Sequence, residues 1–230
     1  MATQERPSSP EPVVIAPTAE HTATVIFVHG LGQLNSSWVP TLRRVAERLS
    51  GVKWVLPQAP DAPVTFSQER RSPSWFNIVS LPPCNGYDEA GVSASVARLE
   101  NLIISEVRQG TPSTKIVLVG FSQGASLSLM TALTTLHELG GVASLSGWIP
   151  QQSRQAMQQI EPSLPVFWAH GTVDDEVPLS YGEECVSFLR NTLRMPSDNF
   201  SFKTYEGLGH DVNETVLDDL AAWLSTVLSS

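Results

Sequence analysis

The sequence predicts an α/β domain in which a mostly parallel central sheet carries helices on both faces. Short apolar runs rich in β-branched residues alternate along the chain with segments whose apolar residues recur every three or four positions. Three of the runs, VIFV, IVLV and VFWA, are nearly continuous, as expected for parallel strands buried on both faces. Strands that alternate with helices imply right-handed crossovers, and these put helices on both faces of one sheet.

The individual elements follow from these two patterns. The predicted strands are residues 23–29, 52–56, 115–120, 141–146, 164–170 and 199–205. The predicted helices are residues 39–49, 92–107, 180–194 and 216–227, with a further apolar helix that follows residue 122 and ends at Gly140. The stretch between Gly147 and the next strand is too short for a cap domain. Any cover over a substrate must come from residues 57–83, which are Pro-rich and predicted to be irregular.

Length and composition indicate one domain. The chain has 230 residues, of which 41% are hydrophobic, and this is enough to bury one sizeable core. We expect residues 23–230 to form a single domain and residues 1–22, rich in Pro, Ser, Thr and Glu, to be a disordered lead-in. The net charge of -9 argues against a protein that binds the phosphates of nucleic acids.

The sequence also predicts a cytoplasmic location. Residues 1–22 lack the apolar core of a secretory signal, and no apolar run approaches the roughly 18–20 residues that a transmembrane helix needs. The two cysteines, Cys84 and Cys185, cannot build a disulfide framework, and their scarcity suits a reducing compartment.

The segment Gly120-Phe-Ser-Gln-Gly124 matches the nucleophile elbow G-x-S-x-G. The elbow requires a strand, a sharp turn and a helix, and the segment lies between the predicted strand 115–120 and an apolar helical stretch. The turn would project the Ser122 hydroxyl at the carboxyl edge of the sheet, where open α/β sheets bind ligands. It would also place Ser122 at a helix N-terminus, which favours developing negative charge. The pattern therefore predicts a nucleophilic serine on an α/β-hydrolase fold.

A nucleophilic serine needs a base and an acid, and in this fold they follow in the order Ser, acid, His. Of the five histidines, His210 lies between the last predicted strand and the C-terminal helix, and this is the place from which the base can reach the serine. His29 and His170 each end a strand and precede a glycine, so we expect structural roles for them. The acid should follow the strand 164–170, where three adjacent carboxylates, at residues 174, 175 and 176, are candidates.

The oxyanion hole should come from two backbone N–H groups. One belongs to Gln123, the residue after the nucleophile, and the other to a loop after the first apolar strand. That loop reads His29-Gly-Leu-Gly32, and its glycines let the backbone approach a substrate carbonyl. We expect Leu31 to be the second donor.

Together these segments resemble the acyl-protein thioesterase and lysophospholipase family of small carboxylesterases. The matching motifs, in chain order, are FVHGLG (27–32), PVTFSQERRSPSWFNI (63–78), DEAGV (88–92), GFSQGASLSLMTALT (120–134), LSGWIP (145–150), HGTVDDEVP (170–178) and GLGH (207–210). They cover essentially the whole predicted domain. The departures are Gln33, Gln58, Asn77 and Ala125, and none of them removes a catalytic group.

The resemblance implies a serine hydrolase that cleaves acyl thioesters or carboxylic esters through an acyl-enzyme. It selects Asp174 as the acid, with Asp175 as the fallback. It places the acyl chain in an apolar groove formed by Leu31, Trp75, Phe76, Trp148 and Val177. The expected partner is an acylated protein or a small acyl ester, and the expected state is a monomer or weak homodimer. No cysteine precedes Cys84, so we expect no lipid anchor of the kind that some relatives carry near the N-terminus.

Two other functions remain open at this point. One is a specialised carboxylesterase or lactone hydrolase of the same fold. The other is a non-catalytic binding module on this scaffold, although such proteins commonly lose a triad member. The histidines and cysteines lack metal-ligand spacing and no nucleotide fingerprint is present, so we expect neither a metal nor a cofactor.

Overall fold

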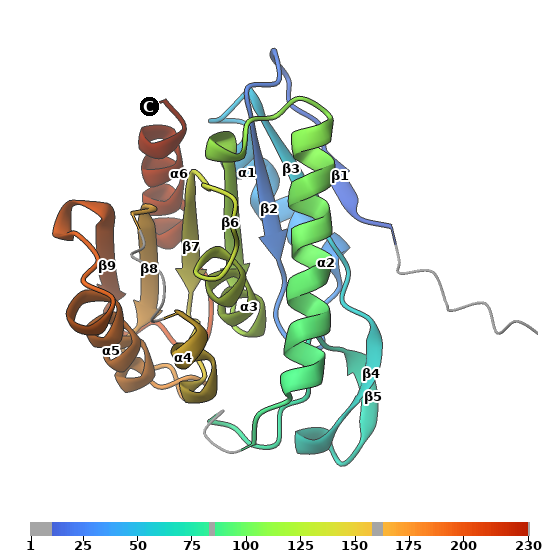
Figure 1. The fold of residues 1–230 in the computed structure, drawn as a ribbon, viewed down its shortest axis with the longest axis vertical. Helices are drawn as coiled ribbons and strands as arrows, with labels where there is room; N and C mark the ends of the chain where they lie inside the picture. The colour runs from blue at the N-terminus through green and yellow to red at the C-terminus, as the bar shows by residue number, and fades with distance from the viewer. Residues whose placement is uncertain (1–10, 83–85, 158–162, 230) are drawn as a thin grey trace, which may run out of the picture.

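The computed structural model describes residues 11–82, 86–157 and 163–229 (Figure 1). Within them, seven strands form the central sheet in the order β1-β3-β2-β6-β7-β8-β9. The strands are β1 (Val13–Ile15), β2 (Ala23–Val28), β3 (Val52–Leu56), β6 (Ile116–Phe121), β7 (Gly141–Leu145), β8 (Val166–Gly171) and β9 (Phe200–Tyr205). Neighbouring strands from β3 to β9 are parallel, and only the edge strand β1 runs antiparallel to its neighbour, β3. The predicted α/β-hydrolase fold with a mostly parallel sheet is confirmed.

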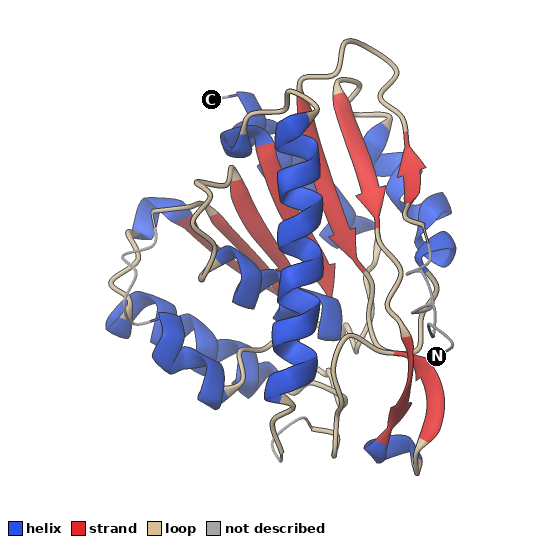
Figure 2. Cartoon of the chain, turned by 45° about the vertical axis from the view of Figure 1, so that its right-hand side comes forward, coloured by secondary structure: helices blue, strands red, loops and turns tan. Residues whose placement is uncertain are grey.

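Helices cover both faces of this sheet (Figures 1 and 2). They are α1 (Val39–Ala46), α2 (Glu89–Arg108), α3 (Gln123–Ala132), the short α4 (Arg154–Met157), α5 (Leu179–Ser187) and α6 (Glu214–Ser229). The shorter 3-10 turns are Asn35–Trp38, Thr65–Ser67, Ser113–Lys115, Gln151–Ser153 and Ser197–Asn199, and a π-turn, Phe188–Thr192, follows α5. One buried cluster joins α2, α3 and α5 to one face of the sheet, and a second joins α1 and α6 to the other.

The order of the strands determines where a ligand can bind. From β2 the chain goes first to β3 on one side and later to β6 on the other, so the direction of winding changes between β2 and β6. Open α/β sheets bind ligands at the carboxyl ends of the strands at such a switch point. Here the segments that follow β2 and β6 begin with His29 and Ser122. Every residue of both strands is buried, which fixes these segments on a rigid base.

The disordered lead-in predicted over residues 1–22 is wrong for its second half. Residues 13–15 form β1, whose Ile15 packs into the cluster beneath α1 and α6. The strand pairs with β3, for example Val14 with Val55. A three-residue run followed closely by Pro17 gives almost no periodic signal, and its stability comes from a partner about forty residues later. Residues 1–10 of the predicted lead-in lie outside the described part of the chain.

Two further predictions of local structure differ from the structure. Residues 57–83 are not wholly irregular, because β4 (Asp61–Val64) and β5 (Arg70–Pro73) pair as an antiparallel hairpin. The helix after Ser122 ends at Ala132 rather than at Gly140, and Leu136 is fully exposed beyond it. Threonines have low helix propensity, and the hydroxyl of Thr134 donates to the carbonyl oxygen of Met130 at 2.6 Å.

Candidate active site

Ser122 occupies a strained backbone conformation between β6 and α3. Its φ of 54° and ψ of -122° lie outside the regions that residues with a side chain normally adopt. Two hydrogen bonds hold it there: its N–H donates to the Leu145 carbonyl at 2.9 Å, and its own carbonyl accepts from the Ser126 N–H at 3.1 Å. Strain maintained by surrounding structure is typical of functional positions.

Two glycines make this turn sterically feasible. A Cβ on Gly120 would lie 2.3 Å from the carbonyl oxygen of Gly124, across the turn. A Cβ on Gly124 would lie 2.1 Å from the carbonyl oxygen of Val28, at the end of β2. The second contact shows that the N-terminus of α3 lies directly against β2, which brings the serine and the loop after β2 together.

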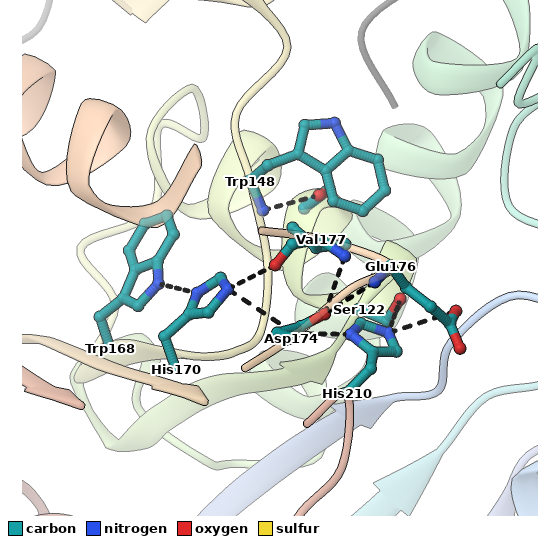
Figure 3. A network of polar contacts seen from close by, with 9 residues as sticks. Ser122, Trp148, Trp168, His170, Asp174, Glu176, Val177 and His210 are labelled. Atoms are coloured by element: carbon teal, nitrogen blue, oxygen red, sulfur yellow. Dashed lines mark hydrogen bonds and ion pairs between the residues drawn. The ribbon is translucent and has the colours of Figure 1, made fainter. Parts of the chain in front are cut away.

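Ser122, His210 and Asp174 form one hydrogen-bonded line (Figure 3). The Ser122 Oγ lies 2.8 Å from His210 Nε2, and His210 Nδ1 lies 2.8 Å from Asp174 Oδ2. An ionised carboxylate can only accept, so the ring carries its proton on Nδ1 and leaves Nε2 to accept from the serine. The ring of Phe121 packs on the imidazole with ring centroids 4.9 Å apart. The three residues come from the loops after β6, β8 and β9.

The buried Asp174 remains a carboxylate in this setting. Its Oδ1 accepts from the N–H groups of Val177 at 2.8 Å and Glu176 at 3.1 Å, while Oδ2 faces His210. Burial alone would raise the pKa of the Asp174 carboxyl, but the hydrogen bonds from His210 and Val177 outweigh burial and hold the pKa below its usual value.

The three adjacent carboxylates therefore have different surroundings. Asp174 is the carboxylate bonded to the imidazole, whereas Asp175 is exposed and has no contact with it in the described structure. Glu176 is half exposed, with Oε2 at 3.9 Å from His210 Nε2 on the side of the ring that faces the serine (Figure 3).

His170 supports the loop that carries the acid. Its Nδ1 lies 3.4 Å from the Trp168 indole N–H, which makes Nδ1 an acceptor and puts the ring proton on Nε2. That Nε2 donates to the Val177 carbonyl at 2.7 Å and lies 3.6 Å from Asp174 Oδ2. Burial lowers the pKa of His170, so the ring stays neutral.

His29 braces the loop after β2 in a similar way, by joining it to the segment after β3. Its Nε2 accepts from the Ala59 N–H at 3.1 Å, so Nδ1 carries the proton and donates to the Gly30 carbonyl at 2.8 Å. Burial lowers the pKa of His29 as well. Both histidines that end a strand thus act as hydrogen-bonding braces away from the serine.

The loop after β2 lies beside Ser122. A Cβ on Gly30 would lie 3.2 Å from the Ser122 Cβ. The Gly30 N–H donates to Gln33 Oε1 at 2.8 Å, and the Gly32 N–H donates to the Pro73 carbonyl at 2.8 Å, at the end of β5. Across residues 11–82, 86–157 and 163–229, the N–H groups of Leu31 and Gln123 donate to no protein acceptor. Gln33, one of the departures from the family pattern, thus shapes this loop.

The side chain of Gln123 has a role that the sequence analysis did not anticipate. It is fully buried, its Oε1 accepts from the Trp75 N–H at 3.0 Å, and its Nε2 donates to the Phe76 carbonyl at 2.7 Å. It therefore ties the first turn of α3 to the segment that follows the β4–β5 hairpin. The sequence shows a glutamine inside the elbow motif, but its hydrogen-bond partners lie almost fifty residues away, so the sequence alone does not reveal them.

The apolar residues predicted to bind substrate are mostly buried, and two of them are in contact. Trp75, Phe76, Trp148 and Val177 are buried, and Leu31 is half-buried. Phe76 and Trp148 meet edge to face with ring centroids 6.2 Å apart and line a cavity of about 230 Å³. The Trp75 indole donates to the His29 carbonyl at 2.8 Å, and Val177 contacts Asp174 through its backbone. The triad does not line this cavity.

Residues 11–82, 86–157 and 163–229 hold no cluster of three or more His, Cys, Asp or Glu side chains that could bind a metal ion. None of the helices in those ranges is both long and apolar enough to cross a membrane.

Comparison with known proteins gives matches along nearly the whole chain. Residues 9–228 match the model of the phospholipase/carboxylesterase family. Acyl-protein thioesterase 1 of Yarrowia lipolytica is 39% identical over 94% of this chain and 96% of its own length. Acyl-protein thioesterase 1 of Cryptococcus neoformans is 36% identical over 96% and 99%. The crystal structure of Zea mays acyl-protein thioesterase 2 superposes with a TM-score of 0.82 at 27% identity, covering 95% of this chain and 99% of that one.

Proposed function

Because this chain belongs to the phospholipase/carboxylesterase family of serine hydrolases, we propose that it cleaves acyl thioesters and carboxylic esters through an acyl-enzyme on Ser122. The observation that carries the proposal is the line of two 2.8 Å hydrogen bonds from Ser122 through His210 to Asp174. A serine hydroxyl is a weak nucleophile until a base removes its proton, and this line supplies the base and the group that orients it.

In the first half of the reaction, His210 Nε2 accepts the Ser122 proton while Oγ attacks the acyl carbonyl carbon. The carbonyl oxygen becomes an oxyanion, which we assign to the N–H groups of Leu31 and Gln123. Two features support this assignment: both groups lack a protein acceptor within the described residues, and the Leu31 loop lies against the nucleophile. A donor in such a hole is worth about 3–4 kcal/mol in the transition state.

Collapse of the tetrahedral intermediate releases the carrier. The C–S or C–O bond breaks, the imidazolium returns its proton to the leaving sulfur or oxygen, and the acyl group stays on Ser122 Oγ. Asp174 stabilises the imidazolium through the bond to Nδ1, and its lowered pKa keeps it ionised for this task. Water then takes the place of the carrier: His210 removes its proton as the water oxygen adds to the acyl carbon. The bond between the acyl carbon and Ser122 Oγ then breaks, the imidazolium returns the proton to Oγ, and the carboxylic acid leaves.

For the substrate we propose an acylated protein, in which the acyl group is a thioester on cysteine. Curated relatives at 36% and 39% identity are named acyl-protein thioesterases and match almost their full lengths. We propose that Leu31, Trp75, Phe76, Trp148 and Val177 form the walls along which the acyl chain lies. The edge-to-face contact of Phe76 and Trp148 supports two adjoining apolar walls.

Labelling with a fluorophosphonate probe tests the proposed nucleophile. Wild-type protein is expected to label and to hydrolyse an acyl thioester, and Ser122→Ala is expected to lose both. Ser36→Ala, a change at an exposed serine, is the matched control and should behave as wild type. Wild-type protein that neither labels nor hydrolyses a p-nitrophenyl ester or acyl thioester would contradict the proposal and favour a non-catalytic binding module.

A further inference from the structure

A second carboxylate stands beside the catalytic imidazole, on the side opposite the acid. Glu176 Oε2 lies 3.9 Å from His210 Nε2, whereas Asp174 binds Nδ1 (Figure 3). The Glu176 N–H donates to Asp174 Oδ1 at 3.1 Å, so the acid itself fixes the backbone that presents the second carboxylate. The Glu176 side chain is 55% exposed and therefore reaches solvent beside the imidazole.

The position of this charge indicates which part of a substrate it meets. This step depends on the proposed function, in which Nε2 returns a proton to the leaving group. The leaving group must therefore lie within hydrogen-bonding distance of Nε2 when the C–S or C–O bond breaks. A carboxylate 3.9 Å from the same nitrogen lies next to the carrier of the acyl group rather than next to the acyl chain.

Glu176 forms no ion pair with a lysine or arginine of the described residues. Six other acidic side chains of these residues do, for example Glu106 with Lys53 at 2.8 Å and Glu184 with Arg154 at 2.7 Å. Over the described ranges, Glu176 has no lysine or arginine within ion-pair distance, and its partner is His210. Its neighbour Asp175 is exposed and also acidic. The surface formed by Asp175 and Glu176 therefore presents negative charge that a positively charged substrate can neutralise.

We propose that Glu176 determines specificity by favouring acyl carriers with a positive charge next to the scissile bond, such as an acylated cysteine flanked by lysine or arginine. Anionic carriers should be disfavoured by the same charge. Opposite charges several ångströms apart at a protein surface interact weakly, so we expect roughly a three- to tenfold effect on kcat/KM for each unit of carrier charge. The effect should shrink as added salt screens the interaction.

Two matched substrate series test this proposal. In the first, one acyl group is joined as a thioester to thiocholine, 2-mercaptoethanol or 3-mercaptopropionate, whose carriers are positive, neutral and negative. In the second, the same acyl group is joined to the cysteine of peptides that differ only in flanking arginine, serine or glutamate. The quantity compared is kcat/KM, because it reports every step through formation of the acyl-enzyme and is unaffected by deacylation, which all carriers share.

The variants are Glu176→Gln, Glu176→Lys and the control Asp175→Asn, which removes a charge from the same loop without changing the group at His210. Wild-type protein should prefer positive over negative carriers roughly tenfold or more at low salt. Glu176→Gln should reduce the preference to near one, Glu176→Lys should reverse it, and Asp175→Asn should keep most of it. A preference in both series indicates a basic peptide, whereas one confined to the thiols indicates a small cation.

Other outcomes overturn the proposal in distinguishable ways. If the neutral thioester is hydrolysed in a Ser122-dependent manner but Glu176→Gln leaves the carrier preference unchanged, only the role of Glu176 is wrong. The same holds if Asp175→Asn abolishes the preference as fully as Glu176→Gln does. If wild-type protein fails on the neutral thioester and on the fluorophosphonate probe, the proposed function is wrong, and the specificity is wrong with it.

Discussion

A Cβ on Gly171 would lie 2.1 Å from the carbonyl oxygen of Leu208, so the last residue of β8 is pressed against the segment after β9. Asp174 lies three residues after Gly171, and His210 lies two residues after Leu208. The contact sets the distance between the acid and the base, whose nearest atoms lie 2.8 Å apart. Glycine is therefore required at residue 171 for a packing reason that bears directly on the triad.

Gly171→Ala should disturb this contact and, through it, catalysis. The new methyl group would have to displace backbone, and overpacking of this kind costs about 1–3 kcal/mol in the free energy of unfolding. We also expect kcat to fall more than KM rises, because the displaced loops carry the acid and the base. Urea unfolding and steady-state kinetics measure both effects. Gly209→Ala is the matched control, since a Cβ there would meet nothing closer than 3.9 Å; equal effects of the two changes would contradict this account.

Asp174→Asn should lower kcat by roughly 10³–10⁴-fold. Asp174 Oδ1 already accepts from the N–H groups of Glu176 and Val177, so the amide nitrogen of an asparagine would face Nδ1. A donor at that place favours the wrong tautomer of the ring and does not stabilise the imidazolium. The neighbouring Asp175→Asn variant should retain most of the activity, because Asp175 is exposed and lies away from the ring. The pair of variants therefore tests which of the adjacent carboxylates serves the base, and the reverse pattern of losses would reassign the acid.

Acid should destabilise the fold in a window set by two buried histidines. Burial lowers the pKa of His29 and of His170, so the folded protein keeps both rings neutral while the unfolded chain binds protons below about pH 6.5. The unfolded state then binds more protons, and the free energy of unfolding falls as pH is lowered from about 6.5 through the folded pKa values. The contribution of Asp174 has a separate window, because its pKa is lowered: it is present above about pH 3.9 and is lost as pH falls further.

Urea unfolding between pH 5 and 7 measures this slope. His170→Gln provides the comparison, because glutamine can donate to the Val177 carbonyl but does not titrate. The variant should be less stable than wild type at pH 7 and should lose less additional stability between pH 7 and 5. Parallel curves for the two proteins would show that His170 does not contribute to the acid response.

Gln123→Ala should destabilise the protein by about 2–4 kcal/mol, since it leaves the Trp75 N–H and the Phe76 carbonyl without their buried partner and opens a cavity. The backbone N–H of residue 123 survives the change, so the proposed donor to the oxyanion is kept. Labelling by a fluorophosphonate probe should consequently persist at temperatures where the variant is folded. Ser36→Ala, at an exposed position, should leave the unfolding curve unchanged, and an equally stable Gln123→Ala would contradict the bracing role.

Local sequence determined the parallel strands, the elbow and the order of the candidate residues. The strand 52–56 was predicted with the bounds that β3 has, because Val52, Trp54 and Val55 are residue types that favour strands. The glycine at 120 could be interpreted without a structure, since the collision that it avoids is with Gly124 in the elbow itself, whereas Gly124 avoids a collision with Val28 that only the packed sheet creates. His210 was selected by its place after the last strand.

Only the tertiary structure decided features that depend on partners far along the chain. β1 exists because β3 offers it an edge, and Gln123 is a brace because the segment after the hairpin returns to α3. The residues alone left three carboxylates equivalent. The structure distinguishes them, because Asp174 is buried against His210 Nδ1 whereas the Glu176 side chain is exposed to solvent near Nε2. Periodicity and turn chemistry record what a residue does among its neighbours in sequence, whereas hydrogen-bond partners and burial are set by how the loops pack at the edge of the sheet.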